Sequence, residues 1–287
     1  MSADVHGRHA AGGPGVSRLA ADGLRLAYED RVVVEDLSVA VPDGSFTVVV
    51  GPNACGKSTL LRALARTLAP RAGTVLLDGR PITALPSKDV ARRLALLPQG
   101  PVAPEAITVE DLVSRGRYPY QRLLRQWSPE DARAVAVAMA ATGVSDLAAR
   151  AVNELSGGQR QRVWLAMALA QDTPIILLDE PTTFLDIAHQ HEVLDLCADL
   201  HDSGRTLVAV LHDLNQASRY ATHLIAMKDG RIVAQGPPAE VVTAERIRDV
   251  FGLSCRVLPD PETGTPMVVP ARRGAHVTAP RGGSTPA

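Results

Sequence analysis

The chain has 287 residues, of which 46% are hydrophobic and 21% are charged, values ordinary for a globular protein. Its formal net charge of -1 provides no overall electrostatic attraction for nucleic acid, so we expect no nucleic-acid partner. No apolar run reaches the roughly 18 residues of a membrane span. Residues 1–17 lack the apolar stretch of a signal peptide, and we expect a disordered leader there. The three cysteines form no C-x-x-C pair, which fits a reducing cytoplasm.

The first structured segment is predicted to be an antiparallel pair of strands, 19–28 and 31–41, joined by a short Glu29-Asp30 turn. Tyr28 stands at this turn in a chain with only 3% aromatic residues. Its ring could stack on a purine. From the residues alone, a tyrosine on the surface of a β-sheet explains the position equally well.

A phosphate-binding loop follows the next predicted strand, 46–50. The motif G-x-x-x-x-G-K-[ST] is matched by Gly51-Pro52-Asn53-Ala54-Cys55-Gly56-Lys57-Ser58-Thr59. Leucines at helical spacing come next, as far as Leu68, before Pro70 and Gly73. In a strand, loop and helix arranged in this order, backbone N–H groups and the helix dipole attract a polyphosphate. Lys57 would neutralise β- and γ-phosphate oxygens, and the Ser58 hydroxyl would bind Mg²⁺.

The middle of the chain changes from strands to helices. Residues 74–79 and 94–97 are predicted strands, with a short helical stretch over 90–93, and Gln99 follows the second strand. The helical pattern then covers residues 108–115, 129–142 and 144–149, with an arginine- and tyrosine-rich loop over 115–120. We interpret the block from about residue 100 to 170 as an inserted helical subdomain.

A second helix start with an affinity for anions lies near the end of this block, at Leu155-Ser156-Gly157-Gly158-Gln159. Ser156 suits the N-cap position, and the two glycines leave backbone amides uncovered. Such a start could receive an anion, although taken alone it is about as often purely structural.

Two carboxylates follow the apolar run 175–178, which predicts a buried strand. Ligands lie at this carboxyl end in open parallel sheets. Asp179 could hold the Mg²⁺ shell, and Glu180 could orient and polarise an attacking water. Solvated acids at a strand end are the alternative. The next buried strand, 206–211, is followed by His212. Because a P-loop and an acidic pair precede it in the chain, His212 becomes a candidate γ-phosphate contact.

The C-terminal part is predicted to contain a hairpin that turns at Asp229-Gly230, helices over 238–251, and two short strands at 254–258 and 267–269. We expect disorder after Pro270. The main domain is accordingly predicted to span 18–258, and residues 259–287 form a C-terminal extension.

One copy of the chain offers one polyphosphate cradle and one spare anion-binding helix start. Two copies arranged head to tail would use both, because each start would cap the γ-phosphate in the other's cradle. ATP would then join the copies, and hydrolysis would release them. Asp186, six residues after Glu180, would sit at the joint.

The phosphate loop, Gln99, LSGGQ, LLDE and His212, in this order and spacing, resemble the ATPase subunit of an ABC transporter over residues 19–258. The resemblance implies an α/β, P-loop NTPase fold with a mixed-sheet core, an antiparallel β subdomain and an inserted α-helical subdomain. It also implies ATP and Mg²⁺ as cofactors, an adenine stack for Tyr28, Mg²⁺ contact and sensing of the membrane subunit for Gln99, and a signature acting in trans for Ser156 to Gln159. Glu180 would be the catalytic base, Asp186 the D-loop residue and His212 the switch.

Further segments are similar to iron(III)-siderophore importer ATPases, among them the ferric enterobactin type: residues 114–119, 155–161, 186–190, 212–217 with 219–221, and 264–266 with 268–270. This likeness implies a homodimer with ATP between the subunits, held by two permease subunits on the cytoplasmic face of the inner membrane. It implies, indirectly, an extracytoplasmic siderophore-binding protein. Cobalamin or haem as cargo, or a soluble ABC ATPase of cluster assembly, are the alternatives.

Two residues of the phosphate loop, Ala54 and Cys55, lead to separate predictions about backbone strain and thiol reactivity. Ala54 stands where this family commonly has glycine, so a positive φ there would strain it. Cys55 lies at a helix N-terminus, where the pKa of a thiol tends to fall. We therefore expect Cys55 to be alkylated in a reaction that ATP blocks.

Overall fold

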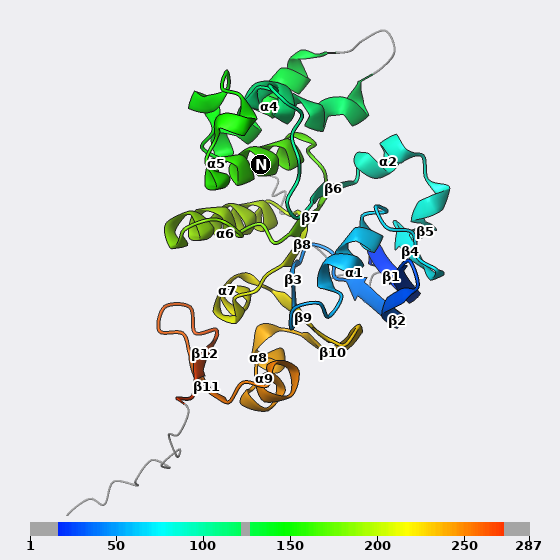
Figure 1. The fold of residues 1–287 in the computed structure, drawn as a ribbon, viewed down its shortest axis with the longest axis vertical. Helices are drawn as coiled ribbons and strands as arrows, with labels where there is room; N and C mark the ends of the chain where they lie inside the picture. Colours follow the sequence, from blue (N-terminus) through cyan, green and yellow to red (C-terminus); the bar gives the residue numbers. More distant parts are fainter. Residues whose placement is uncertain (1–16, 122–126, 273–287) are drawn as a thin grey trace, which may run out of the picture.

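The computed structural model describes residues 17–121 and 127–272 (Figure 1). The expected leader, apart from residue 17, lies outside these ranges, and so does the segment expected to be disordered after Pro270, apart from residues 271 and 272. Within them, no helix is both long enough and apolar enough to cross a membrane.

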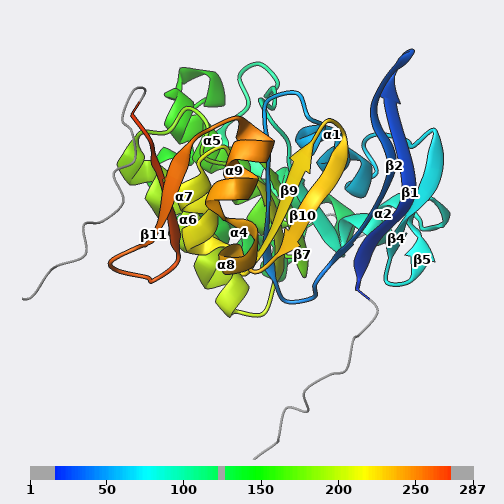
Figure 2. The same ribbon diagram turned by 90° about the horizontal axis from the view of Figure 1, so that it is seen from below.

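An antiparallel sheet of order β2-β1-β4-β5 forms one side of the molecule beside α1 (Figures 1 and 2). Its strands are β1 (Leu19–Tyr28), β2 (Arg31–Val41), β4 (Ala72–Leu77) and β5 (Arg80–Pro81). Tyr28 and Arg31 are directly paired across the turn between the first two strands. The predicted antiparallel pair and its turn are confirmed.

The central sheet has the order β10-β9-β3-β8-β7-β6. Neighbours from β9 to β6 run parallel, and only β10 is antiparallel to its neighbour, so the sheet is mixed as predicted. The strands are β3 (Phe46–Val50), β6 (Leu94–Leu97), β7 (Ile175–Asp179), β8 (Thr206–Val210), β9 (His223–Lys228) and β10 (Arg231–Gly236).

Both faces of this sheet are covered, which explains why its strands are apolar without alternation. Along β3, Val48 and Val50 point into one buried cluster while Val49 points into the other. Along β7, Ile176 and Leu178 lie in the first cluster and their neighbours in the second. The polar groups at the carboxyl ends of these strands are therefore held by a rigid, close-packed layer.

The helices of the described ranges are α1 (Lys57–Leu64), α2 (Ser87–Ala91), α3 (Val109–Ser114), α4 (Pro129–Ala141), α5 (Gly157–Ala170), α6 (Ile187–Asp202), α7 (Leu214–Tyr220), α8 (Pro238–Val241) and α9 (Ala244–Phe251). Short 3₁₀ turns are η1 (Ile82–Ala84), η2 (Arg115–Tyr120), η3 (Ser145–Leu147) and η4 (Val152–Glu154). Figure 1 shows α4 and α5 together at the end of the molecule away from β1 and β2.

Four helical predictions differ from the structure. The short helix expected over 90–93 lies earlier, as α2, which ends at Ala91. The first helix ends at Leu64 rather than near Leu68, because the chain turns at Arg66 with a φ of 60°. The predicted helix over 144–149 is only the 3₁₀ turn η3. The predicted loop over 115–120 is η2, held against α5, since a Cβ on Gly116 would come within 2.3 Å of the Met167 carbonyl oxygen.

The C-terminal hairpin consists of β11 (Cys255–Pro259) and β12 (Pro266–Pro270). It lies beside α7 in both views (Figures 1 and 2). Val268 is 5% exposed and belongs to the buried cluster on that side of the central sheet. The hairpin therefore packs on the domain and shares its core.

Candidate functional site

The loop between β3 and α1 has a backbone that only glycine allows at its two ends. A Cβ on Gly51 would lie 2.2 Å from the Met227 carbonyl oxygen, and Gly56 has a φ of 105°. Gly56 is also the N-cap of α1, so no side chain caps this helix start, and its first turn contains no acid. The N–H groups of the first turn can therefore hold an anion.

The Lys57 side chain is buried, and its ammonium donates hydrogen bonds of 2.8 Å to the carbonyl oxygens of Gly51 and Pro52. Both acceptors belong to the loop itself. The loop thus fixes the cation at its own centre, where it adds a full charge to the partial charges of the helix start.

Asp179, at the end of β7, is joined to the loop by a hydrogen bond of 2.7 Å from the Ser58 hydroxyl to its Oδ1. The residue is 1% exposed, and burial raises the pKa of its carboxyl, while the Ser58 hydrogen bond opposes the rise. Its Oδ2 is buried and finds no hydrogen-bond partner among the described residues. An orphaned carboxylate oxygen beside a hydroxyl is a donor set that fits Mg²⁺.

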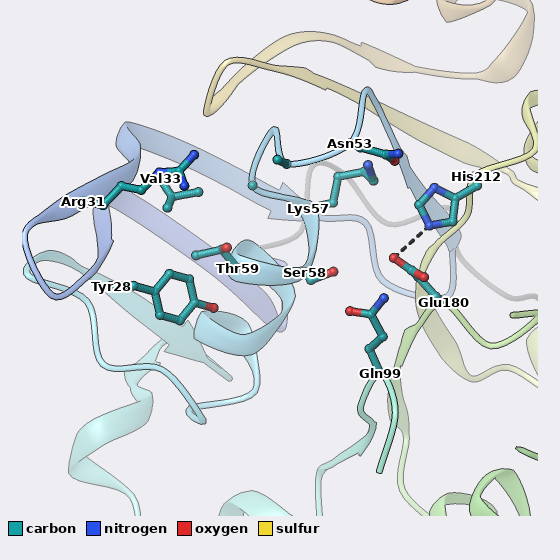
Figure 3. A pocket seen from close by; sticks show the side chains of 12 residues that line it. Tyr28, Arg31, Val33, Asn53, Lys57, Ser58, Thr59, Gln99, Glu180 and His212 are labelled. Carbon is teal, nitrogen blue, oxygen red and sulfur yellow. Dashed lines mark ion pairs between the residues drawn. The ribbon is translucent and has the colours of Figure 1, made fainter. Parts of the chain in front are cut away.

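Glu180 and His212 meet at the carboxyl ends of β7 and β8. Glu180 Oε1 lies 2.8 Å from His212 Nε2 (Figure 3), and the Thr183 hydroxyl donates to the other oxygen at 3.2 Å. Glu180 has a φ of 56°, a left-handed conformation that is uncommon for a side-chain-bearing residue and is often found at functional sites. The predicted neighbourhood of these two residues is therefore present in the structure.

A cavity of about 610 Å³ unites most of the residues proposed from the sequence. Figure 3 shows Ser58, Gln99 and Glu180 facing one space, with Tyr28 at the far side. The predicted residues that line the cavity are Tyr28, Asn53, Ala54, Gly56, Lys57, Ser58, Thr59, Gln99, Glu180 and His212. The volume and the polar lining suit a small, charged ligand.

Sequence reasoning missed two lining residues, Arg31 and Val33. Both lie at the start of β2, and Arg31 is the cross-strand partner of Tyr28. The predicted hairpin contained the signal, because a residue paired with Tyr28 has to lie close to anything that stacks on it. Tyr28 itself is 40% exposed, and Arg62 donates a hydrogen bond of 3.2 Å to its hydroxyl.

The other predicted residues lie outside the cavity lining. Gly51 and Cys55 in the loop and Asp179 at the end of β7 are buried. The second helix start lies on different elements: Ser156 caps α5 in a reciprocal pair with Gln159, and Asp186 caps α6 by accepting from the His189 N–H. These two caps are neighbours, since a Cβ on Gly158 would lie 3.1 Å from Leu185 Cδ2. The predicted residues at the start of α5 are Ser156, Gly157, Gly158 and Gln159, and Asp186 lies at the neighbouring start of α6.

Two predictions concerned Ala54 and Cys55 in the phosphate loop. Ala54 has a φ of 60°, so the strain expected for a positive φ applies. For Cys55 the expected direction is wrong. Its thiol is 5% exposed in the core beside α1, and burial raises its pKa more than the nearby Lys57 charge lowers it. That ATP blocks its alkylation stays a prediction.

A P-loop joined to a buried acid, a glutamate–histidine pair and a separate glycine-led helix start define a class of nucleotide-dependent cassettes. The comparisons agree: residues 34–183 match the family model described as "ABC transporter". The chain therefore belongs to the ABC transporter family, which confirms the predicted ABC ATPase class and fold.

Among individual proteins, the chain is 56% identical over 261 residues to "Probable siderophore transport system ATP-binding protein YusV" of Bacillus subtilis, covering 91% of this chain and 95% of that protein. It is 56% identical over 265 residues to "Ferric enterobactin transport ATP-binding protein FepC" of Escherichia coli, covering 92% and 98%. A solved "inward-facing conformation of a putative metal-chelate type ABC transporter" superposes with a TM-score of 0.76 at 27% identity, covering 90% of this chain and 99% of the other.

Proposed function

We propose that the chain is the ATP-hydrolysing subunit that powers import of an iron(III)-siderophore complex across a bacterial inner membrane, working from its cytoplasmic face. The observation that carries the proposal is the single cavity in which the phosphate loop, Gln99 and the Glu180–His212 pair face one another. The names of the two relatives described above support the cargo, since both refer to siderophore transport.

In this proposal the triphosphate lies along the loop between Asn53 and Thr59, with Lys57 against the β- and γ-phosphates and Tyr28 stacked on the adenine. Ser58, Asp179 and Gln99 would hold Mg²⁺, for which the unpartnered Asp179 Oδ2 is the supporting observation. Bound Mg²⁺ supplies charge neutralisation on the phosphate oxygens.

Hydrolysis in this proposal depends on Glu180 and His212. Glu180 accepts a proton from the attacking water, and its left-handed backbone turns the carboxylate into the cavity. His212 holds Glu180 Oε1 through the 2.8 Å contact. The other carboxylate oxygen, which accepts a hydrogen bond from the Thr183 hydroxyl, is left to face the water. Both side chains come from the ends of packed strands, so they are positioned before the substrate arrives.

The remaining predicted residues act between two copies in this proposal. The helix start at Ser156 to Gln159 of one copy would cap the γ-phosphate in the other copy, with Asp186 at the joint. A solved dimeric bacterial ABC cassette among the structural neighbours supports this arrangement. Two permease subunits would hold the dimer, and an extracytoplasmic siderophore-binding protein would deliver the cargo to them.

The test is uptake of radiolabelled cargo in a deletion strain complemented with the native chain or with Glu180→Gln. We expect the native chain to restore uptake of a ferric catecholate siderophore and Glu180→Gln to fail despite normal expression, because the amide cannot accept the proton. Parallel assays use labelled haemin and cobalamin.

Restoration of haemin or cobalamin uptake alone would show that the cargo is wrong. A chain that restores none of the three and never co-purifies with a polytopic membrane protein would instead be a soluble ATPase of the same family.

A further inference from the structure

The C-terminal hairpin is fastened to α7 by the side chain of one residue, Asn215. The Val268 N–H donates a hydrogen bond of 2.7 Å to Asn215 Oδ1, and Asn215 Nδ2 donates one of 3.3 Å to the Val268 carbonyl oxygen. The amide thus satisfies both backbone groups of a single residue on β12, as a neighbouring strand would.

This fastening lies at the end of α7 that follows His212. The next residue, Asp213, is the N-cap of α7, and its Oδ1 accepts from the N–H groups of Asn215 and Gln216 at 2.7 and 2.9 Å. Asn215 is therefore held by its backbone to the cap and by its side chain to the hairpin.

A second side chain at the start of α7 is held as well. Gln216 Nε2 donates to Gln190 Oε1 on α6 at 2.8 Å, and Gln190 Nε2 donates to the Leu185 carbonyl oxygen at 3.1 Å. Farther along α7, Arg219 forms an ion pair with Glu262 in the hairpin turn. The start of α7 is thus hydrogen-bonded both to α6 and to β12.

We propose that Asn215 is a positioning residue for hydrolysis: by clamping the start of α7 to Val268, it keeps His212 against Glu180. The reason is geometric, because His212 is half exposed and its contact with Glu180 is a single hydrogen-bond-length approach. A turn free to shift by about 1 Å lengthens such a contact enough to weaken it. The inference rests on the role given to the Glu180–His212 pair under the proposed function.

The experiment compares steady-state ATP hydrolysis of the full-length native chain with that of Asn215→Leu, which has similar volume but neither hydrogen-bonding group. Loss of the clamp is expected to lower kcat about fivefold while KM for MgATP changes less than about twofold, because the phosphate loop is untouched. Asn215→Asp keeps the acceptor for the Val268 N–H but places an oxygen against the Val268 carbonyl oxygen, so it is expected to recover kcat only in part.

Val268→Ala is the matched control. It removes buried apolar contacts from the same interface and keeps both backbone hydrogen bonds, so it should lower the melting temperature but leave kcat per folded molecule unchanged. If Asn215→Leu keeps the native kcat, or loses no more than Val268→Ala at equal melting temperature, the clamp has no part in hydrolysis.

His212→Ala is measured beside these variants to separate the two proposals. Native turnover in His212→Ala would overturn the role of His212 and the clamp with it. A large loss in His212→Ala together with native turnover in Asn215→Leu would overturn the clamp alone.

Discussion

At the scale of single residues, the site carries backbone strain on both sides of the cavity. Ala54 and Glu180 have φ values of 60° and 56°, and both line the cavity. A left-handed conformation costs an L-residue about 1–2 kcal/mol, which the surrounding loop and sheet must offset. In the proposed mechanism, the strained backbone of Glu180 turns toward the cavity the carboxylate that accepts the proton. For Ala54 no such benefit is visible, because its methyl group bears no chemistry.

Replacing Ala54 with glycine should therefore stabilise the chain in the absence of nucleotide. Glycine removes the strain but gains conformational freedom in the unfolded state, and the difference leaves about 0.5 kcal/mol in favour of the variant. Thermal unfolding followed by circular dichroism measures it as a rise of about 1–2 °C in melting temperature. Ala54→Val is the control and should melt below the native chain, since a β-branched residue tolerates positive φ least. A glycine variant that melts lower would show that Ala54 is unstrained.

The sequence specifies the site well at this scale wherever a motif fixes the backbone. Glycine spacing determines the loop, and apolar runs determine which strand ends carry Glu180 and His212. It fails where burial decides the outcome. Nothing in the loop sequence says that the Cys55 side chain points into the core, and that orientation reverses the expected direction of its pKa. Arg31 reaches the cavity only through the pairing of two strands.

At the scale of elements, η2, α4 and α5 are joined by one buried ion pair. Arg117 Nε lies 2.8 Å from Asp131 Oδ1 on α4, and its Nη1 donates to the Ala170 carbonyl oxygen at the end of α5 at 2.9 Å. The Tyr120 ring lies 3.9 Å from the guanidinium carbon. Both charged side chains are almost fully buried. Three elements of the helical subdomain therefore depend on the same cation.

Arg117→Leu should destabilise the chain by about 3–5 kcal/mol, because it leaves the Asp131 charge buried and unpaired. Urea unfolding measures this loss. The double variant Arg117→Leu/Asp131→Leu is the control, and it should be more stable than the single variant because no buried charge remains. Additive losses in the double variant would contradict the account and assign the cost to packing alone.

The same pair predicts a pH dependence. Burial raises the pKa of Asp131, but the hydrogen bonds from Arg117 and Ser128 lower it by more than burial raises it. The pKa in the folded chain therefore lies below the ordinary value. The carboxylate thus contributes stability above the unfolded pKa of about 4, and this is lost as pH falls through the lower folded pKa. Urea midpoints measured from pH 6 to pH 3 should fall less for Asp131→Asn than for the native chain; equal slopes would exclude this residue as a cause.

The sequence predicts the buried strands more accurately than the ends of the helices, and the reasons are physical. The buried strands are correct because parallel strands covered on both faces must be continuously apolar. Helix ends are less certain, since α1 stops at Leu64 through a left-handed residue that leaves no mark in the apolar pattern. The turn η2 exists because Gly116 and Arg117 meet α5, a tertiary contact that local sequence does not report.

At the scale of the whole molecule, the phosphate cradle and the second helix start are separate surfaces of one chain. Among the described residues, the lining of the cavity formed by the phosphate loop, Gln99 and Glu180 contains none of the residues from Ser156 to Gln159, nor Asp186. Ser156, Gly157 and Asp186 are instead exposed. The two glycines of this helix start bear no side chains, and Phe184 beside Gly157 is 79% exposed, which leaves a surface suited to a second copy.

The most direct test of this arrangement is the mass in solution of the full-length Glu180→Gln chain, measured by light scattering after gel filtration with MgATP or MgADP. The account predicts twice the single-chain mass with MgATP and the single-chain mass with MgADP, because only ATP has a γ-phosphate for the second helix start to hold. Adding Ser156→Arg, which fills the helix start, should abolish the dimer while ATP binding persists. A chain that binds MgATP and keeps the single-chain mass, even with its membrane partners present, would contradict the account.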